Sequence, residues 1–180
     1  NIKYITVLFL TIFLSPVNAN NAHNENNYTI QGYGAGKDDG EQTTNITAVG
    51  SYVLSSMETV ENAVGVGEDA LRNTTTGDNL VAVGTDALKA NTTGSQNSAV
   101  GSSALTANTT GANNNAFGMQ SLLSNTTGDQ NNAMGFEALQ ANTTGDYNTA
   151  LGSKALAANT TASNNVAIGY QTMDANTTGT

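Results

Sequence analysis

The side chains that could carry out chemistry in this chain are mostly asparagine, threonine and aspartate. His23 is the only histidine, cysteine is absent, and lysine and arginine together number five. A single histidine in a polar stretch is typical of a solvated loop residue, and the absence of thiols excludes thiolate metal sites and disulfides. The sequence therefore predicts no catalytic residues, no cofactor and no metal site, and we expect that the chain is not an enzyme.

The segment 32–37, Gly-Tyr-Gly-Ala-Gly-Lys, has some of the features of a phosphate-binding loop. That loop requires a glycine five residues before Gly36, where Gln31 stands, and Ser or Thr after the lysine, where Asp38 stands. We interpret the segment as a flexible glycine turn.

Acidic residues do not recur at a constant position. At one position of a 17-residue repeat, the successive copies carry Asp78, Ser95, Ala112, Asp129, Asp146 and Ser163. A ladder of calcium sites would require regular carboxylates. We interpret Asp129 and Asp146, the two acidic residues in consecutive copies, as a solvated pair rather than a cation site.

One set of asparagines recurs at a constant spacing of 17 in the sequence: Asn91, Asn108, Asn125, Asn142, Asn159 and Asn176. Each begins Asn-Thr-Thr, which is an acceptor sequence for N-glycosylation. Aligned asparagines can instead stack their amides into a hydrogen-bonded ladder. We favour the ladder, because these asparagines keep the register of the repeat, and we expect the glycine that follows to supply a turn with positive φ.

The same period organises the chain from Val81 to Gly179 in six copies without insertions. A column of glycines closes an Ala-Φ-Gly triplet, in which Φ is a large apolar residue, and is predicted to form turns: Gly84, Gly101, Gly118, Gly135, Gly152 and Gly169. A further column holds Leu88, Leu105, Leu122, Leu139, Leu156 and Met173. A constant period without insertions indicates a stack of equal structural units.

The unit is too short for a pair of helices, and its glycines and Asn-Thr-Thr runs disfavour one long helix. We therefore predict an all-β fold, a parallel β-solenoid of 17-residue coils. Each coil should hold two short strands and two turns, stacked at about 4.8 Å.

The strand in each copy is predicted to be apolar on both faces, because side chains alternate along a strand. One face carries alanine in every copy, and the other carries Val83, Val100, Phe117, Met134, Leu151 and Ile168. One face should fill the coil and the other should meet a partner surface. The sequence leaves open which is which.

The sequence divides into four segments, of which the last two form the repeat domain. Residues 1–19 have a basic start, an apolar run and a small-x-small end at Val17-Asn18-Ala19, which indicates a signal peptide. We expect an irregular lead-in or linker at 20–44, degraded capping copies at 45–72 and regular repeats at 73–180, so that the solenoid domain covers 45–180. The signal peptide predicts a secreted or cell-surface protein.

Charge and hydropathy exclude two classes of partner. The net charge is −9 and the few basic residues are scattered, so nucleic-acid binding is not expected. The apolar run near the N-terminus is far shorter than the roughly 20 residues of a spanning helix, so no membrane span is predicted in this segment.

The motif Asn-x-Ala-Φ-Gly stands at 97–101, 148–152 and 165–169. In this motif the chain resembles the head repeats of trimeric autotransporter adhesins, the YadA-like or haemagglutinin-type family. The resemblance implies a left-handed β-roll, a homotrimer, binding to extracellular matrix or a cell-surface ligand, and a stalk and outer-membrane anchor beyond Thr180. The period here is longer than in that family, because each copy includes Asn-Thr-Thr-Gly. Similar repeats also occur in phage tail fibres.

The leading hypothesis from the sequence is a cell-surface adhesin head that acts by multivalent contact and mediates attachment to host matrix or other cells. The alternatives are a phage tail-fibre-like protein, a self-assembling extracellular filament and, less favoured, an ice-binding protein. Ice binding would use one outward rank of threonines: Thr92, Thr109, Thr126, Thr143, Thr160 and Thr177. No ligand-contacting residue follows from the sequence.

Overall fold

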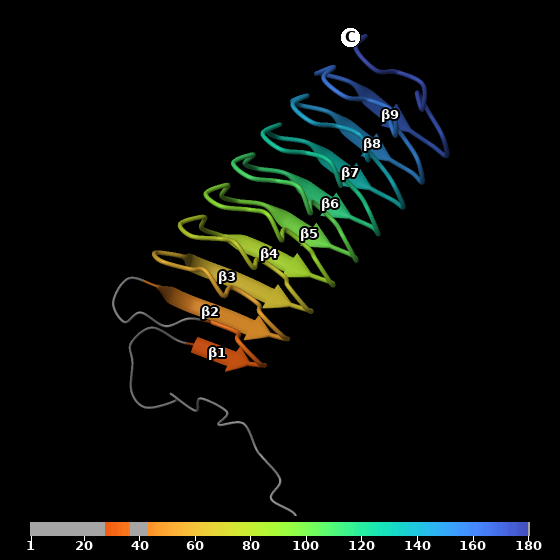
Figure 1. Cartoon of the computed structure of the whole chain (residues 1–180). Coiled ribbons are helices and arrows are strands. Elements are labelled where there is room, and N and C mark those ends of the chain that lie inside the picture. Colours follow the sequence, from red (N-terminus) through yellow and green to blue (C-terminus); the bar gives the residue numbers. More distant parts are fainter. Residues whose placement is uncertain (1–27, 37–42, 180) are drawn as a thin grey trace, which may run out of the picture.

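The computed structural model describes residues 28–36 and 43–179, and these residues form a rod of stacked coils (Figure 1). One parallel sheet contains nine strands in chain order, so that each coil lies beside the coils before and after it. The strands are β1 (Tyr28–Gln31), β2 (Thr44–Val49), β3 (Glu61–Val66), β4 (Leu80–Val83), β5 (Ser98–Val100), β6 (Asn115–Phe117), β7 (Asn132–Met134), β8 (Thr149–Leu151) and β9 (Val166–Ile168). The prediction of an all-β parallel β-solenoid is confirmed.

The register of the sheet follows the period of the sequence. From β2 onward each residue pairs with the residue 17 positions later, as Ala99 does with Ala116 and Ala116 with Ala133. Identical positions therefore form columns that run along the rod, and each column repeats at roughly the 4.8 Å separation of paired strands.

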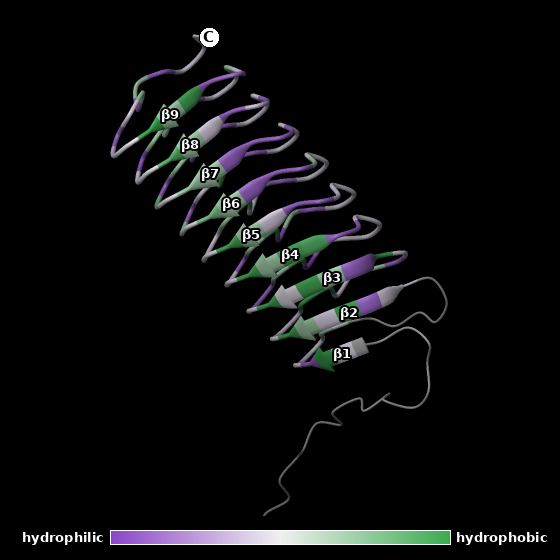
Figure 2. Ribbon diagram, turned by 180° about the vertical axis from the view of Figure 1, so that it is seen from behind, coloured by the Kyte–Doolittle hydropathy of each residue, from purple (hydrophilic) through white to green (hydrophobic). Residues whose placement is uncertain are grey.

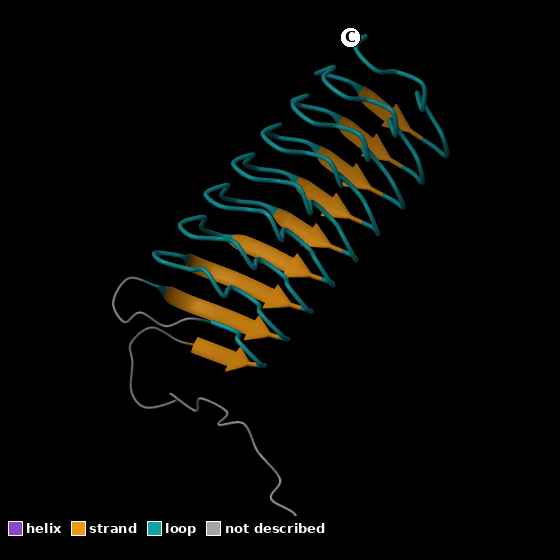
Figure 3. Cartoon of the chain, in the orientation of Figure 1, coloured by secondary structure: helices purple, strands orange, loops and turns teal. Residues whose placement is uncertain are grey.

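The expectation of two strands in each coil is wrong, because each described coil contains one strand and closes through turns (Figure 3). The second side turns at residues with left-handed backbone, such as Asp86 with φ 60° and Leu88 with φ 52°. This side is nevertheless bonded between coils, with Leu88 N–H donating to the Ala104 carbonyl at 3.0 Å. The coils thus stack on both sides, although only one side is extended.

The glycines of the Ala-Φ-Gly triplet end each strand and lie against the same glycine of the next coil. Gly101 has φ 132°, and a Cβ at this position would lie 2.6 Å from the carbonyl carbon and oxygen of Gly118. Both the backbone conformation and the close approach therefore require glycine.

The alanine face of the strands points into the coil, which answers the question that the sequence left open. The buried alanines are Ala82, Ala99, Ala116, Ala133, Ala150 and Ala167. One column of leucines is fully buried opposite them and completes an interior that is narrow and apolar: Leu54, Leu71, Leu88, Leu105, Leu122, Leu139 and Leu156. The large Φ residues point outward.

The stack begins earlier than the sequence predicted. Residues 20–44 were expected to be irregular, yet β1 lies in this segment and pairs with β2. Tyr28 pairs with Ile46, so this first coil is one residue longer than the regular coils of 17 residues. The predicted signal peptide at 1–19, His23 and the rest of the lead-in up to residue 27 lie outside the described residues.

The predicted degraded copies at 45–72 belong to the same stack and have no asparagine ladder in their interior. Met57 and Val60 are buried at the positions that asparagine and glycine occupy in later coils. The interior therefore changes along the rod from apolar to partly polar.

Candidate interaction surface

The regularly spaced asparagines form a continuous ladder inside the coils. The Asn108 amide donates to Asn91 Oδ1 at 2.9 Å and to the Gly111 carbonyl at 2.9 Å. The same pair of bonds recurs at Asn125, Asn142 and Asn159, and all of these side chains are fully buried. At Asn176, in the last described coil, the bond to Asn159 lengthens to 3.5 Å. Because buried polar groups are costly unless they are paired, this ladder ties each coil to its neighbours.

A second asparagine ladder, which the sequence reasoning did not single out, lies beside the first. It consists of Asn97, Asn114, Asn131, Asn148 and Asn165, all buried. Asn114 Nδ2 donates to the Gly128 carbonyl at 2.8 Å, and its Oδ1 accepts from the Asn131 backbone N–H at 3.0 Å. These residues also keep a spacing of 17, so the period itself could have revealed the column.

The glycines that follow Asn-Thr-Thr have a different role from the one predicted. They lack positive φ, so the expected left-handed turn at these positions is wrong. A Cβ on Gly111 would instead lie 2.5 Å from Asn108 Oδ1 and 2.6 Å from the Gly128 carbonyl oxygen. Glycine avoids this crowding while its carbonyl accepts from two asparagines, although the column also admits an alanine. Ala162, in the same column, accepts from Asn148 and Asn159 in the same way.

The burial of Asn91, Asn108, Asn125, Asn142 and Asn159 argues against glycosylation of these five asparagines in the folded chain. Asn108 is fully buried, and its amide nitrogen already donates two hydrogen bonds. A glycan on that nitrogen would replace one donated hydrogen and would have no route to solvent.

The outer face of the sheet carries a column of large apolar side chains. Phe117 is 40% exposed, Met134 51% and Ile168 66%, and Val83 and Leu151 are also exposed. Further exposed apolar residues flank this column: Val81, Val166, Met119, Phe136 and Tyr170. Figure 2 shows the hydrophobic residues at the ends of the middle strands and hydrophilic residues at the beginnings of these strands. Exposed apolar faces of this kind are typical of interaction sites. We refer to the column Val83, Val100, Phe117, Met134, Leu151 and Ile168 as the apolar column.

The threonines are arranged differently from the rank proposed for ice binding. Thr92, Thr109, Thr126 and Thr143 are half-buried, and each donates its hydroxyl to the threonine carbonyl of the next coil at 3.0 Å. The exposed rank consists of the second threonine of each Asn-Thr-Thr segment: Thr93, Thr110, Thr127, Thr144 and Thr161. The glycine or alanine that follows each of them is buried, so the exposed threonines form a single rank.

Asp129 and Asp146 are structural hydrogen-bond acceptors rather than a solvated pair. Asp129 Oδ1 accepts from the Ala112 backbone N–H at 2.7 Å, and Asp146 Oδ1 accepts from the Asp129 N–H at 2.7 Å. Ser163 accepts in the same way from Asp146. Every member of this column except Ala112 thus accepts a hydrogen bond from a backbone N–H of the previous coil.

A small ionic cluster joins two neighbouring coils near the beginning of the stack. Lys89 Nζ lies 2.8 Å from Asp69 Oδ2 and 2.9 Å from Asp86 Oδ1, and Arg72 Nη1 lies 3.1 Å from Asp69. The hydrogen bond from Lys89 lowers the pKa of Asp69, which burial opposes and the charge of Arg72 assists. The bonds to Asp69 and Asp86 raise the pKa of Lys89. Both ionised forms are therefore stabilised by folding.

The part of the chain that the structure describes contains no cluster of three or more His, Cys, Asp or Glu side chains that could hold a metal ion. Among the same residues, no helix has the length and apolar character needed to cross a bilayer. Comparison of the chain with protein-family models, with characterised proteins and with solved structures gave no match. The resemblance to adhesin head repeats thus remains a prediction from the repeat motif.

Proposed function

We propose that this chain is the head of a cell-surface adhesin, a rigid non-enzymatic rod that assembles as a homotrimer and attaches to extracellular matrix or cells by multivalent contact. The observation that carries the proposal is the exposed apolar column along the outer face of the sheet. A rod that exposes Phe117, Met134 and Ile168 to water would be prone to associate. Complete burial of a large apolar side chain contributes about 1.5–3 kcal/mol, and these three side chains, at 40%, 51% and 66% exposed, would gain roughly half of that.

The regular geometry of the rod also suits self-association. The outward residues repeat at one spacing along one face, so an identical face on a second chain offers a matching row at every coil. A closed ring of such contacts would cover the apolar column, whereas an open arrangement would leave part of it exposed. Three copies of a weak ligand surface would then bind more tightly than one, because the second and third contacts are intramolecular.

The oligomeric state is tested by sedimentation of the wild-type chain and of a variant with charges in the apolar column, Met134→Asp with Leu151→Asp. Because a buried carboxylate without a partner is strongly disfavoured, we expect a trimeric wild type and a monomeric variant. The matched control, Thr110→Asp with Thr127→Asp, adds the same charge at exposed threonines and should remain trimeric. A wild-type monomer at concentrations of tens of micromolar would count against the assembly.

The attachment function is tested with beads that carry the wild-type chain, the monomeric variant or the threonine control. Binding is measured on surfaces coated with collagen, fibronectin or laminin and on cultured cells. We expect adhesion from the wild type and the threonine control and a large loss from the monomeric variant. A trimer that adheres to none of these surfaces would contradict the proposed function while leaving the assembly intact.

A further inference from the structure

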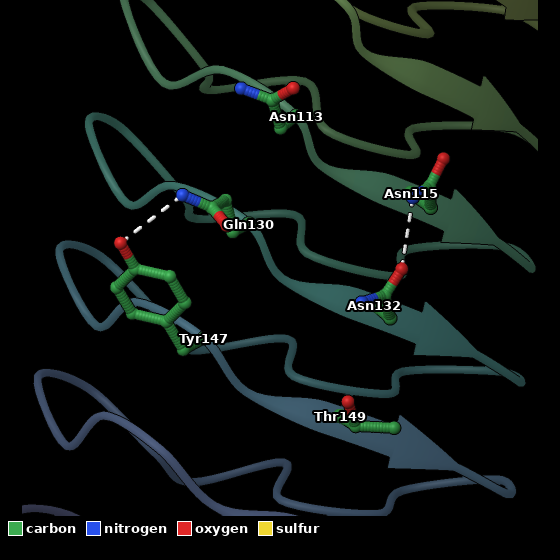
Figure 4. A pocket seen from close by; sticks show the side chains of 6 residues that line it. All are labelled: Asn113, Asn115, Gln130, Asn132, Tyr147 and Thr149. Atoms are coloured by element: carbon green, nitrogen blue, oxygen red, sulfur yellow. Dashed lines mark hydrogen bonds between the residues drawn. The ribbon is translucent and has the colours of Figure 1, made fainter.

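A shallow polar groove crosses three coils on the outside of the rod (Figure 4). Its volume is about 370 Å³, and it is lined by Asn113, Asn115, Gln130, Asn132, Tyr147 and Thr149. Each coil contributes two of these residues, one directly before a buried asparagine of the second ladder and one directly after it. Three successive coils give the groove a length of roughly 10 Å at the spacing of paired strands, which is close to the length of a disaccharide.

The lining is neutral and rich in groups that both donate and accept hydrogen bonds. It contains four amides, one phenol and one hydroxyl, and no charged side chain. Asn115 Nδ2 donates to Asn132 Oδ1 at 2.9 Å, and Gln130 Nε2 donates to Tyr147 Oη at 3.1 Å. Each amide has two donor hydrogens and an acceptor oxygen, so these bonds orient the side chains and leave capacity for a ligand.

Tyr147 adds an aromatic surface at one end of this groove. Its side chain is 53% exposed, and Figure 4 shows its hydroxyl directed toward Gln130. An exposed tyrosine beside several amides combines an apolar ring, on which the C–H face of a sugar can stack, with partners for vicinal hydroxyl groups. An acidic chain without a basic residue in the groove would repel sulfated or carboxylated ligands.

From these observations we infer that the groove binds a neutral oligosaccharide, with the amides of Asn115, Gln130 and Asn132 engaging its hydroxyl groups and the Tyr147 ring supporting a sugar face. The inference names the ligand class of the proposed adhesin head and rests on that proposed function. The groove and the apolar column lie side by side on the outer face of the strands, since β6 begins with Asn115 and ends with Phe117. Assembly through the apolar column and ligand binding in the groove therefore use different side chains.

The test is titration calorimetry of the full chain with neutral tetrasaccharides of glucose, galactose, mannose and N-acetylglucosamine, and with a heparin tetrasaccharide as the sulfated comparison. We expect at least one neutral ligand to bind with a Kd on the order of 1 mM or tighter. Tyr147→Ala should weaken binding roughly 2–10-fold, the loss expected for one aromatic contact. Tyr147→Phe keeps the ring and should retain most of the affinity, and Tyr33→Ala removes an exposed tyrosine far from both the groove and the apolar column and should change nothing.

The inference is overturned if no neutral tetrasaccharide binds at millimolar concentration, if heparin binds better, or if Tyr147→Ala and Tyr33→Ala have equal effects. Circular dichroism of each variant separates loss of binding from loss of fold. Sedimentation keeps the two proposals distinct. A monomer that binds the sugar would support the groove and contradict the trimer, whereas an adhesive trimer without sugar binding would contradict the groove alone.

Discussion

Removal of one rung from the first asparagine ladder tests whether buried amide pairing holds the coils together. Asn125 lies in the middle of the ladder, is fully buried and takes part in three hydrogen bonds. Its amide donates to Asn108 Oδ1 and to the Gly128 carbonyl, each at 2.9 Å, and its oxygen accepts from Asn142 at 2.8 Å. Asn125→Ala removes all three bonds and leaves most of the neighbouring backbone unchanged.

The magnitude follows from the groups that lose their partners. The Gly128 carbonyl still accepts from Asn114 at 2.8 Å, so it stays satisfied. Asn108 Oδ1 and one N–H of Asn142 are left buried without this partner, and each such loss costs about 1–3 kcal/mol. We therefore expect the free energy of unfolding to fall by about 2–6 kcal/mol, toward the lower value if a water enters the space left by the amide.

The assay is urea unfolding followed by far-UV circular dichroism, at one protein concentration because assembly would affect the midpoint. Asn115→Ala is the matched control, since Asn115 donates a similar bond to Asn132 on the outside of the rod. Water can replace that bond, so the control should lose less than about 1 kcal/mol. Equal midpoints for the two variants would refute the argument that burial makes the ladder costly to interrupt.

Three further outcomes are expected. Gly101→Ala should destabilise the rod by about 2–5 kcal/mol in the same urea assay, because it combines a disfavoured backbone conformation with overpacking against Gly118; a change under about 0.5 kcal/mol would show that the coils can separate to admit a methyl group. Since Lys89 lowers the pKa of Asp69, the stability gained from this carboxylate is present above the ordinary aspartate pKa of about 3.9 and is lost as pH falls through the lower folded value. Asp69→Asn should therefore flatten the acid side of a stability–pH curve, and an unchanged slope below about pH 4 would contradict the assignment. The single rank of exposed threonines predicts no thermal hysteresis in a nanolitre osmometer, and measurable hysteresis would revive the ice-binding alternative.

Much of the architecture could be predicted from the sequence because the period is constant. Equal steps along the chain place equivalent side chains in columns, so the parallel stack and the asparagine ladder follow from spacing alone. The second ladder, which begins at Asn97, keeps the same spacing and follows from the period by the same argument.

The tertiary structure alone decided how each coil closes and therefore which face of the strand is outside. Leu88 and its equivalents adopt left-handed backbone, which no propensity of leucine would suggest, and they interrupt the second strand that the sequence favoured. The direction of this turn buries the small alanines and exposes Phe117, Met134 and Ile168. Alternation along a strand is symmetrical between its two faces. Only the curvature of the closed coil, set by residues far from the strand, distinguishes its interior from the surface available to a partner.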